Sequence, residues 1–154
     1  MANVTNLSAG SNSSLAVGSS ELKIYRHTID IADAVAEGLA TTEYVTVFTF
    51  PADTYYEILA VEVIDALSLG AGARIDLGDA GDDDEYVTNA TTLTAGTRLT
   101  LTADTKKLQN AASEIRLKVT GATIASGVIS VIVQAGNLAP LANAKFPTPT
   151  VVGS

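Results

Sequence analysis

The sequence contains no cysteine and no tryptophan, and it has a single histidine among its 154 residues. The missing cysteines exclude disulfide bonds and thiol catalysis, so a stable fold must rely on apolar packing. Charged residues make up only 17% and aromatic residues only 5% of the chain, whereas hydrophobic residues make up 47%. A chain of this length buries roughly 70% of its unfolded surface on folding, which is enough for one domain with its own core.

The few charges are mostly negative and give a formal net charge of -8 at pH 7. Nucleic-acid binding draws most of its affinity from Lys and Arg, so we expect no direct binding of DNA or RNA. No apolar run approaches the ~20 residues that a membrane-spanning helix needs, so no membrane partner is expected. The segment from Met1 to Leu7 lacks the basic start and apolar run of a secretory signal, which predicts a protein made in the cytoplasm.

Strand-like alternation of apolar residues recurs through the middle of the chain. It is strongest over 55–85, where a strand that is apolar on both faces precedes a glycine turn, a shorter strand and an acidic loop. Polar connections separate the runs at spacings of roughly 8–15 residues, which predicts an all-β, antiparallel β-sandwich of the jelly-roll type. The expected strands cover 21–31, 44–50, 55–64, 74–78, 97–102, 114–119 and 128–134, with a short helix at 30–40, a polar connection at 86–93 and one helical turn at 104–108.

The apolar face of each run defines the expected core. Because a slip of one residue reverses the two faces of a strand, these positions also test the register. In the first strand the apolar face changes between Ile24 and Ile29, which suggests a bulge or a crossing between sheets. The side chains expected between the sheets are Leu59, Val61, Val63, Ile75, Leu99, Leu101, Ile115, Leu117, Ile129, Val131 and Val133.

The two ends of the chain differ from its middle. Residues 1–20 are rich in Ser, Asn and Gly, and residues 136–154 are rich in proline and lose the alternation. Neither end has a periodic apolar face that could offset an ordering cost of roughly 1–2 kcal/mol per residue. We therefore expect a domain at 21–135 with two arms that bind a neighbouring chain. The residues predicted to make this contact are Leu7, Leu15, Val17, Leu138, Leu141, Phe146 and Val151.

Candidate sites for chemistry are few. The carboxylates of the 79–85 loop could supply oxygen ligands to calcium, but their spacing does not match an EF-hand, and a solvated loop is the favoured interpretation. His27 is a lone histidine, and Asp30 and Asp33 near it show no recognised catalytic spacing. Serine nucleophile and phosphate-loop motifs are missing, so we predict no enzymatic activity, no cofactor and no metal. The scattered tyrosines favour packing over a carbohydrate-binding platform.

Three parts of the chain share a recognisable spacing of strand-like apolar runs. They are Thr49–Phe50–Pro51 leading into 57–63, the Leu-Gly-Asp turn within 75–79 with its acidic loop, and the paired runs 115–121 and 127–133. Together they resemble the decoration, or cement, proteins that coat the capsids of tailed bacteriophages. The resemblance implies a β-sandwich that trimerises on the outer surface of the virion and reinforces joints between major capsid subunits. The major capsid protein would then be its partner.

Two other classes stay open on the sequence. One is a carbohydrate- or calcium-binding β-sandwich of a phage fibre or bacterial surface, and the other is a head-completion or tail structural protein. Hundreds of copies on isolated virions would indicate decoration, whereas a few rings would indicate completion. Glycan binding or calcium-dependent melting would indicate the binding module.

Overall fold

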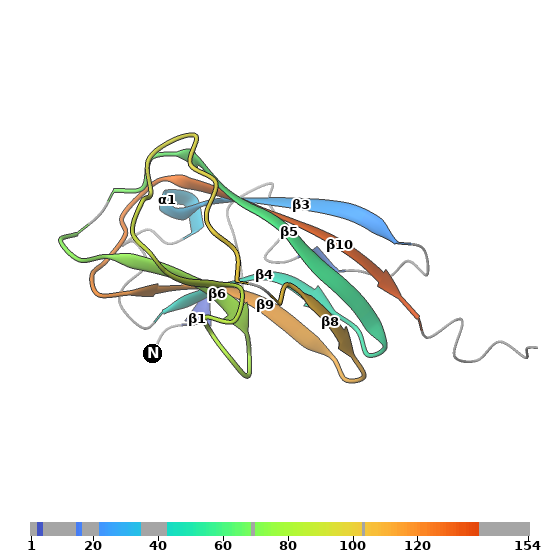
Figure 1. Ribbon diagram of the computed structural model, residues 1–154. Coiled ribbons are helices and arrows are strands. Elements are labelled where there is room, and N and C mark those ends of the chain that lie inside the picture. Colours follow the sequence, from blue (N-terminus) through green and yellow to red (C-terminus); the bar gives the residue numbers. More distant parts are fainter. Residues whose placement is uncertain are drawn as a thin grey trace, which may run out of the picture.

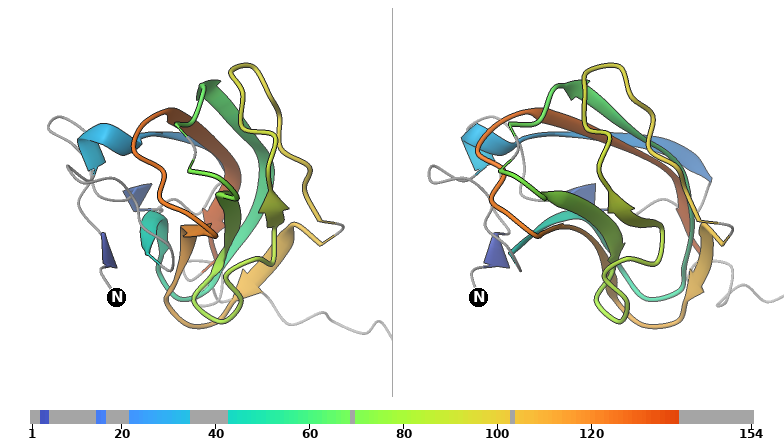
Figure 2. Two further views of the ribbon diagram at one scale, coloured as in Figure 1. Left: turned by 90° about the vertical axis from the view of Figure 1, so that its left-hand side faces the viewer. Right: turned by 60° about the vertical axis from the view of Figure 1, so that its left-hand side comes forward.

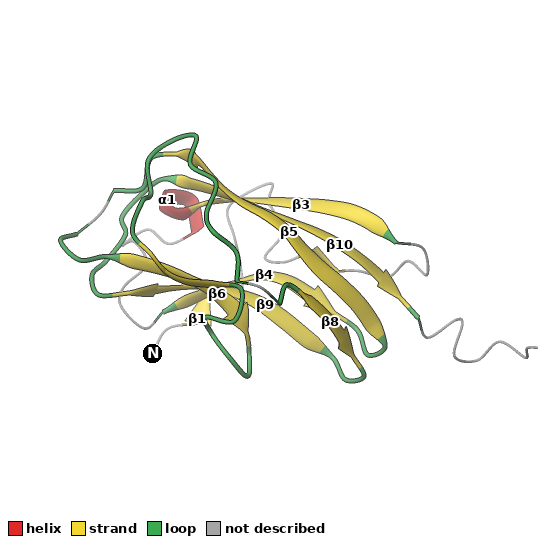
Figure 3. Ribbon diagram, in the orientation of Figure 1, coloured by secondary structure: helices red, strands yellow, loops and turns green. Residues whose placement is uncertain are grey.

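The computed structural model describes residues 3–4, 15–16, 22–34, 43–68, 70–102 and 104–138. These residues form two packed sheets and one short helix (Figures 1 and 3). The elements are β1 (Asn3–Val4), β2 (Leu15–Ala16), β3 (Lys23–Asp30), α1 (Ile31–Ala34), β4 (Tyr44–Phe50), β5 (Thr54–Asp65), β6 (Arg74–Asp79), β7 (Val87–Ala90), β8 (Lys106–Gln109), β9 (Ser113–Thr120) and β10 (Val128–Asn137).

Strands β3 to β10 pair in a nested order. β3 pairs with β10, β4 with β9, β5 with β8 and β6 with β7, all antiparallel. Sheet A has the order β1-β4-β9-β6-β7, with β2 also paired to β4, and sheet B has the order β3-β10-β5-β8. Figure 1 shows β3, β10 and β5 in one layer above β4, β9 and β6, and Figure 2 shows how the sheets curve around the interior. A nested ribbon rolled into two packed sheets is a jelly roll, which confirms the predicted fold class.

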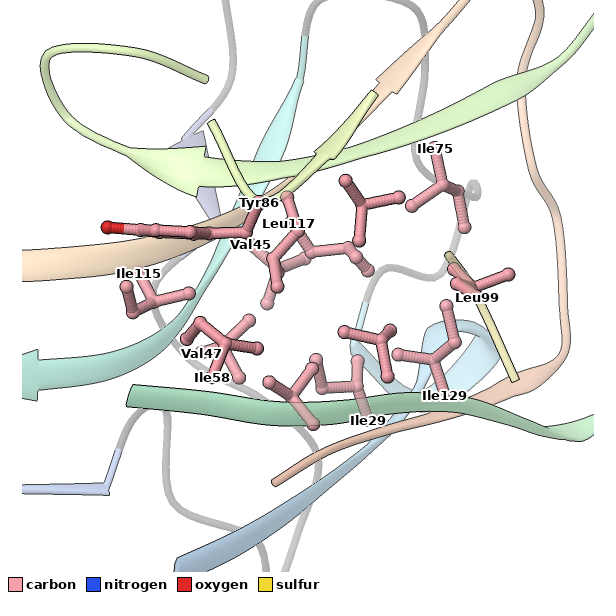
Figure 4. Packing of buried hydrophobic residues seen from close by; sticks show 14 of the residues in the cluster. Ile29, Val45, Val47, Ile58, Ile75, Tyr86, Leu99, Ile115, Leu117 and Ile129 are labelled. Atoms are coloured by element: carbon pink, nitrogen blue, oxygen red, sulfur yellow. The ribbon is translucent and has the colours of Figure 1, made fainter. Parts of the chain in front are cut away.

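The inner faces of the two sheets meet in one apolar core. Ile29, Ile58 and Ile129 of sheet B lie opposite Val45 and Leu117 of sheet A (Figure 4). Every core position predicted from the sequence is buried except two. Leu101 is half-buried and packs against the core, whereas Leu59 lies outside it.

The prediction was wrong for Leu59 because β5 contains a bulge at this residue. Ile58 and Ala60 are opposite the consecutive residues Val133 and Ile132 of β10, so Leu59 has no partner in that strand. An extra residue reverses the alternation of a strand. Ile58 therefore points inward before the bulge and Val61 after it, while Leu59 lies half-buried on the outer face.

Strand β3 lacks an irregularity that the sequence predicts, whereas β5 has a bulge that the sequence does not predict. Its register with β10 is continuous from Lys23 to Asp30, so the predicted bulge or crossing is absent from this strand. Ile24 simply stays on the outer face, while Ile29 points into the core. Asp30 then caps α1, because its Oδ1 accepts the N–H of Ala32 at 3.1 Å. The helix covers Ile31–Ala34, and the rest of the predicted 30–40 helix lies outside the described residues.

Three connections also differ from the sequence prediction. The range 97–102 makes only an isolated bridge between Arg98 and Glu62, not a full strand. The range 86–93, expected to be a polar connection, contains β7, and 104–108, expected to be a helical turn, contains most of β8. Open edges of β5 and β6 offer unpaired backbone groups, and pairing with them outweighs the weak local preference of these segments.

Candidate functional site

The outer face of sheet B carries apolar side chains that are exposed to solvent. Ile24 on β3 is 68% exposed and Leu108 on β8 is 62% exposed. Leu108 is directly opposite Tyr55 of β5, which is half-buried, as are Leu59 and Ile132 near the middle of the face. Ile24 and Leu108 lie at opposite edges of the sheet, with the three half-buried side chains between the two edges. Exposed apolar groups on one sheet face mark a candidate interaction surface. We call these five residues the sheet B surface.

The outer face of sheet A has a different character. Its central strand β9 presents Glu114, Arg116 and Lys118, and all three have charged partners. Arg116 binds Glu114 and also lies over the ring of Tyr44, 4.3 Å from its centroid. Lys118 Nζ lies 2.5 Å from Asp83 Oδ2. The outer face of sheet B also carries two ion pairs, Arg26–Glu62 and Lys106–Glu57. It differs in that large apolar side chains are exposed there, so the sheet B surface is the stronger candidate for binding a partner.

The acidic loop 79–85 is fastened to the sandwich at several points. Gly78 makes the turn possible, because a Cβ there would lie 1.9 Å from the carbonyl oxygen of Asp82. Asp79 is only 5% exposed, and its Oδ1 accepts the backbone N–H groups of Gly81 at 2.7 Å and Asp82 at 3.0 Å. The interpretation of a simply solvated loop is therefore wrong at Asp79, although Asp82 is exposed.

Lys107 ties this loop to the other sheet. Its Nζ lies 2.6 Å from Asp79 Oδ2, and 2.9 and 2.7 Å from the two oxygens of Glu85. Burial alone would raise the pKa of Asp79, but the hydrogen bonds from Lys107, Gly81 and Asp82 outweigh it and lower that pKa. Burial alone would lower the pKa of Lys107, but the two carboxylates outweigh it and raise that pKa. The cluster is thus an ion pair joining β8 of sheet B to β6 of sheet A.

Two further polar contacts cross the core. The hydroxyls of Tyr56 on β5 and Tyr86 before β7 lie 2.5 Å apart, and both side chains are fully buried. Burial raises the pKa of both tyrosines. His27 of β3 donates from Nδ1 to the carbonyl oxygen of Val47 in β4 at 2.6 Å. These contacts join the two sheets, and His27 has a structural partner away from the carboxylates of the acidic loop.

Sequence patterns could not have identified Lys107 and Tyr86 as partners of these groups. Both lie in segments whose secondary structure was predicted wrongly, so the sequence did not show that their side chains point between the two sheets. A signal does exist in the second case, since a tyrosine within a polar Thr/Asn stretch needs burial for its ring and a partner for its hydroxyl. Only the nested strand order brings residues so distant in the sequence into contact.

Most of the predicted partner-binding residues lie outside the described part of the chain: Leu7, Val17, Leu141, Phe146 and Val151. Leu15 lies in β2, which together with β1 pairs in parallel with β4 of the same chain. Leu138 follows β10, and its N–H donates to the carbonyl oxygen of Asp53 at 2.6 Å. The predicted role of all seven residues therefore stays a prediction.

Within the described residues, no group of three or more His, Cys, Asp or Glu side chains is placed to hold a metal ion. The same part of the chain contains no helix long and apolar enough to cross a membrane. An open depression of about 360 Å³ lies beside the acidic loop and is lined by Asp79, Lys107 and Ser113 among others.

The chain folds as a jelly-roll β-sandwich, and two solved structures with a similar fold are chains from phage capsids. The chain is similar to one in the capsid of Ralstonia phage GP4, with a TM-score of 0.56 and 17% identity over 78% of this chain and 86% of that chain. It is similar to a chain in the capsid asymmetric unit of cyanophage Pam1, with a TM-score of 0.55 and 18% identity over 76% of this chain and 85% of that one. No family model and no curated protein matches the sequence. At these identities the likeness shows the shared fold.

Proposed function

We propose that the protein is a structural component of a phage virion, and more specifically a decoration, or cement, protein of the head. It binds the outer surface of the shell, as a trimer, and stabilises contacts between major capsid subunits. The observation that carries this proposal is the fold shared with chains from two phage capsids. Both alignments cover most of both chains, so those capsid chains are close to this one in length and are not large proteins that merely contain a similar domain.

The surface of the molecule supports the same role. Both outer faces carry ion pairs, but Ile24 and Leu108 are exposed apolar side chains on sheet B, which suits a protein that binds through this side. The net charge of -8 disfavours contact with packaged DNA and suits a position outside the shell. The sheet B surface and the two arms would together make the contact with the major capsid protein.

Co-sedimentation with phage shells stripped of the native protein tests this proposal. The full-length chain should bind saturably, in a ratio of hundreds of copies per shell. Leu108→Asp, which places a charge on the sheet B surface without entering the core, should bind at least tenfold more weakly. Ala95→Asp, at an exposed turn beside Val63 and not among the five residues of that surface, is the matched control and should bind like the unchanged protein.

A second comparison separates the arms from the sandwich. A chain of residues 22–138 keeps β3 to β10 complete, because Asn137 still belongs to β10 and is buried. If the arms carry the attachment, this chain should fold but bind shells far more weakly than the full-length protein. Equal occupancy at limiting concentration would move the attachment to the sandwich, and absence of binding by the full-length protein to any shell would contradict the decoration role. Light scattering of the free protein measures whether it is a trimer.

A further inference from the structure

The contact between Lys107, Asp79 and Glu85 has more than the geometry of an ion pair. A primary amine, a buried carboxyl and a second carboxylate meet at the seam between the two sheets, next to the fully buried Tyr56. The amine nitrogen Nζ of Lys107 lies 2.6 Å from Oδ2 of Asp79. The same nitrogen lies 2.7 Å from Glu85 Oε2, which is within reach for direct proton transfer.

The two oxygens of Asp79 are in different surroundings. Oδ1 accepts two backbone N–H groups, from Gly81 at 2.7 Å and Asp82 at 3.0 Å. Two fixed N–H donors on one oxygen stabilise negative charge that develops there when a nucleophile attacks the carbon. Oδ2 is instead close to Lys107 and to Gln109 Nε2, 3.5 Å away. Oδ1 is therefore held as an oxyanion would be, whereas Oδ2 faces the amine that would supply its protons.

We propose that Lys107 and Asp79 condense into an amide bond between their side chains, with Glu85 as the base that moves the protons. Glu85 takes a proton from the ammonium group and passes it to Oδ2. The free amine then attacks Cγ of Asp79, so that a bond forms between Nζ and Cγ while the bond between Cγ and Oδ2 breaks. After the attack, Glu85 takes a second proton from Nζ and passes it to Oδ2, which leaves as water, while the third proton stays on the amide nitrogen. An ammonium and a carboxylate become one amide and one water, and no oxidant or outside reactant is consumed.

The position in the fold favours this step. The reacting groups are held on β6 and β8, and such intramolecular placement corresponds to effective concentrations of about 10⁵–10⁸ M. The resting state is the ion pair, so the proton transfer to Glu85 is the slow event, but the bond has to form only once in each chain. The product would be a covalent link between sheets A and B in a protein without cysteine.

Intact-mass measurement of the purified full-length protein, denatured after incubation at neutral pH, tests the inference. The expected mass is lower than that of the sequence by one water molecule. Trypsin should then release a branched peptide in which residues 75–98 are joined to residues 107–116, because trypsin does not cleave after an acylated lysine. The branched peptide distinguishes this bond from loss of water within a single aspartate.

Two variants provide matched controls. Lys107→Arg keeps a positive charge beside Asp79 but cannot form the bond, so it should have the full mass of its sequence. Glu85→Gln keeps the size of the side chain but removes the base, so the condensed fraction should fall at least tenfold. Unchanged protein that is folded and retains its full mass after prolonged incubation would overturn the inference. Water loss that persists in Lys107→Arg would overturn it as well, and both results are independent of whether the protein binds a phage head.

Discussion

Two leucines on inner strands of the two sheets, Leu117 of β9 and Leu59 of β5, should respond very differently to truncation. Leu117 lies in β9 opposite Val45 on one side and Leu77 on the other, and it is completely buried. Leu117→Ala removes apolar contacts and leaves a cavity between well-packed strands, so it should lower the free energy of unfolding by about 2–5 kcal/mol. Leu59 is the bulged residue on the outer face of β5. Leu59→Ala should therefore cost about 1 kcal/mol or less.

Urea denaturation of the full-length variants measures the two values directly, with an unchanged slope showing that the same surface is exposed on unfolding. In a melting experiment on a domain of this size, the Leu117 variant should unfold about 4–20 °C earlier than the unchanged protein. Measurements at two protein concentrations separate the stability of the sandwich from that of any oligomer. Equal losses for both variants, or a larger loss at Leu59, would show that β5 has no bulge and that its faces are reversed.

Three further outcomes follow from contacts that cross or close the sandwich. Tyr86→Phe should cost about 1–3 kcal/mol of unfolding free energy, and its combination with Tyr56→Phe should cost less than the sum of the two single changes; strict additivity would contradict the hydroxyl pairing. Because burial raises the pKa of both tyrosines in the folded state, they contribute stability that is complete below about pH 10 and lost as the pH rises above it. In an alkaline ultraviolet titration both should ionise only as circular dichroism reports unfolding, and full ionisation of a folded protein would refute this. Gly78→Ala should lower the melting temperature, because its Cβ would collide with the carbonyl oxygen of Asp82 and push the acidic loop away from β6. Gly81→Ala, whose Cβ would meet Asp79 Oδ1 no closer than 3.3 Å, should have a smaller effect, and equal melting of the two variants would contradict the close approach.

Strand alternation was sufficient to predict the architecture but not the irregularities. Tyr44–Phe50 was located to the residue because Pro51 ends it, and the inward positions of β6, β9 and β10 were all correct. Leu59 was assigned to the wrong face because a bulge depends on how β10 pairs with β5, which no single segment encodes. The prediction of a helical turn in place of the short strand β8 is wrong because the local sequence has little preference for helix or strand. Pairing with β5 determines that this segment forms a strand.

The polar contacts were harder to predict than the core. Every carboxylate of the acidic loop was visible in the sequence, but Lys107, which binds two of them, lies more than twenty residues further along. The sheet B surface was hidden for the same reason, since Ile24 and Leu108 come from strands at opposite edges of one sheet. Long-range pairing brings these residues together, and sequence patterns report mainly on neighbours within about one strand.

The nested strand order has a consequence for how the protein is made. β10 is the last of the described strands to leave the ribosome, yet it lies between β3 and β5 and pairs Ala135 with Lys23 of β3. Among the described strands, β3 has no neighbour in its own sheet until β10 has emerged, and sheet B lacks the strand that joins β3 to β5. Closure must therefore follow the completion of synthesis, and the many contacts between distant residues make it slow. A nascent chain stalled before residue 128 would expose much of its future core to solvent and to other chains.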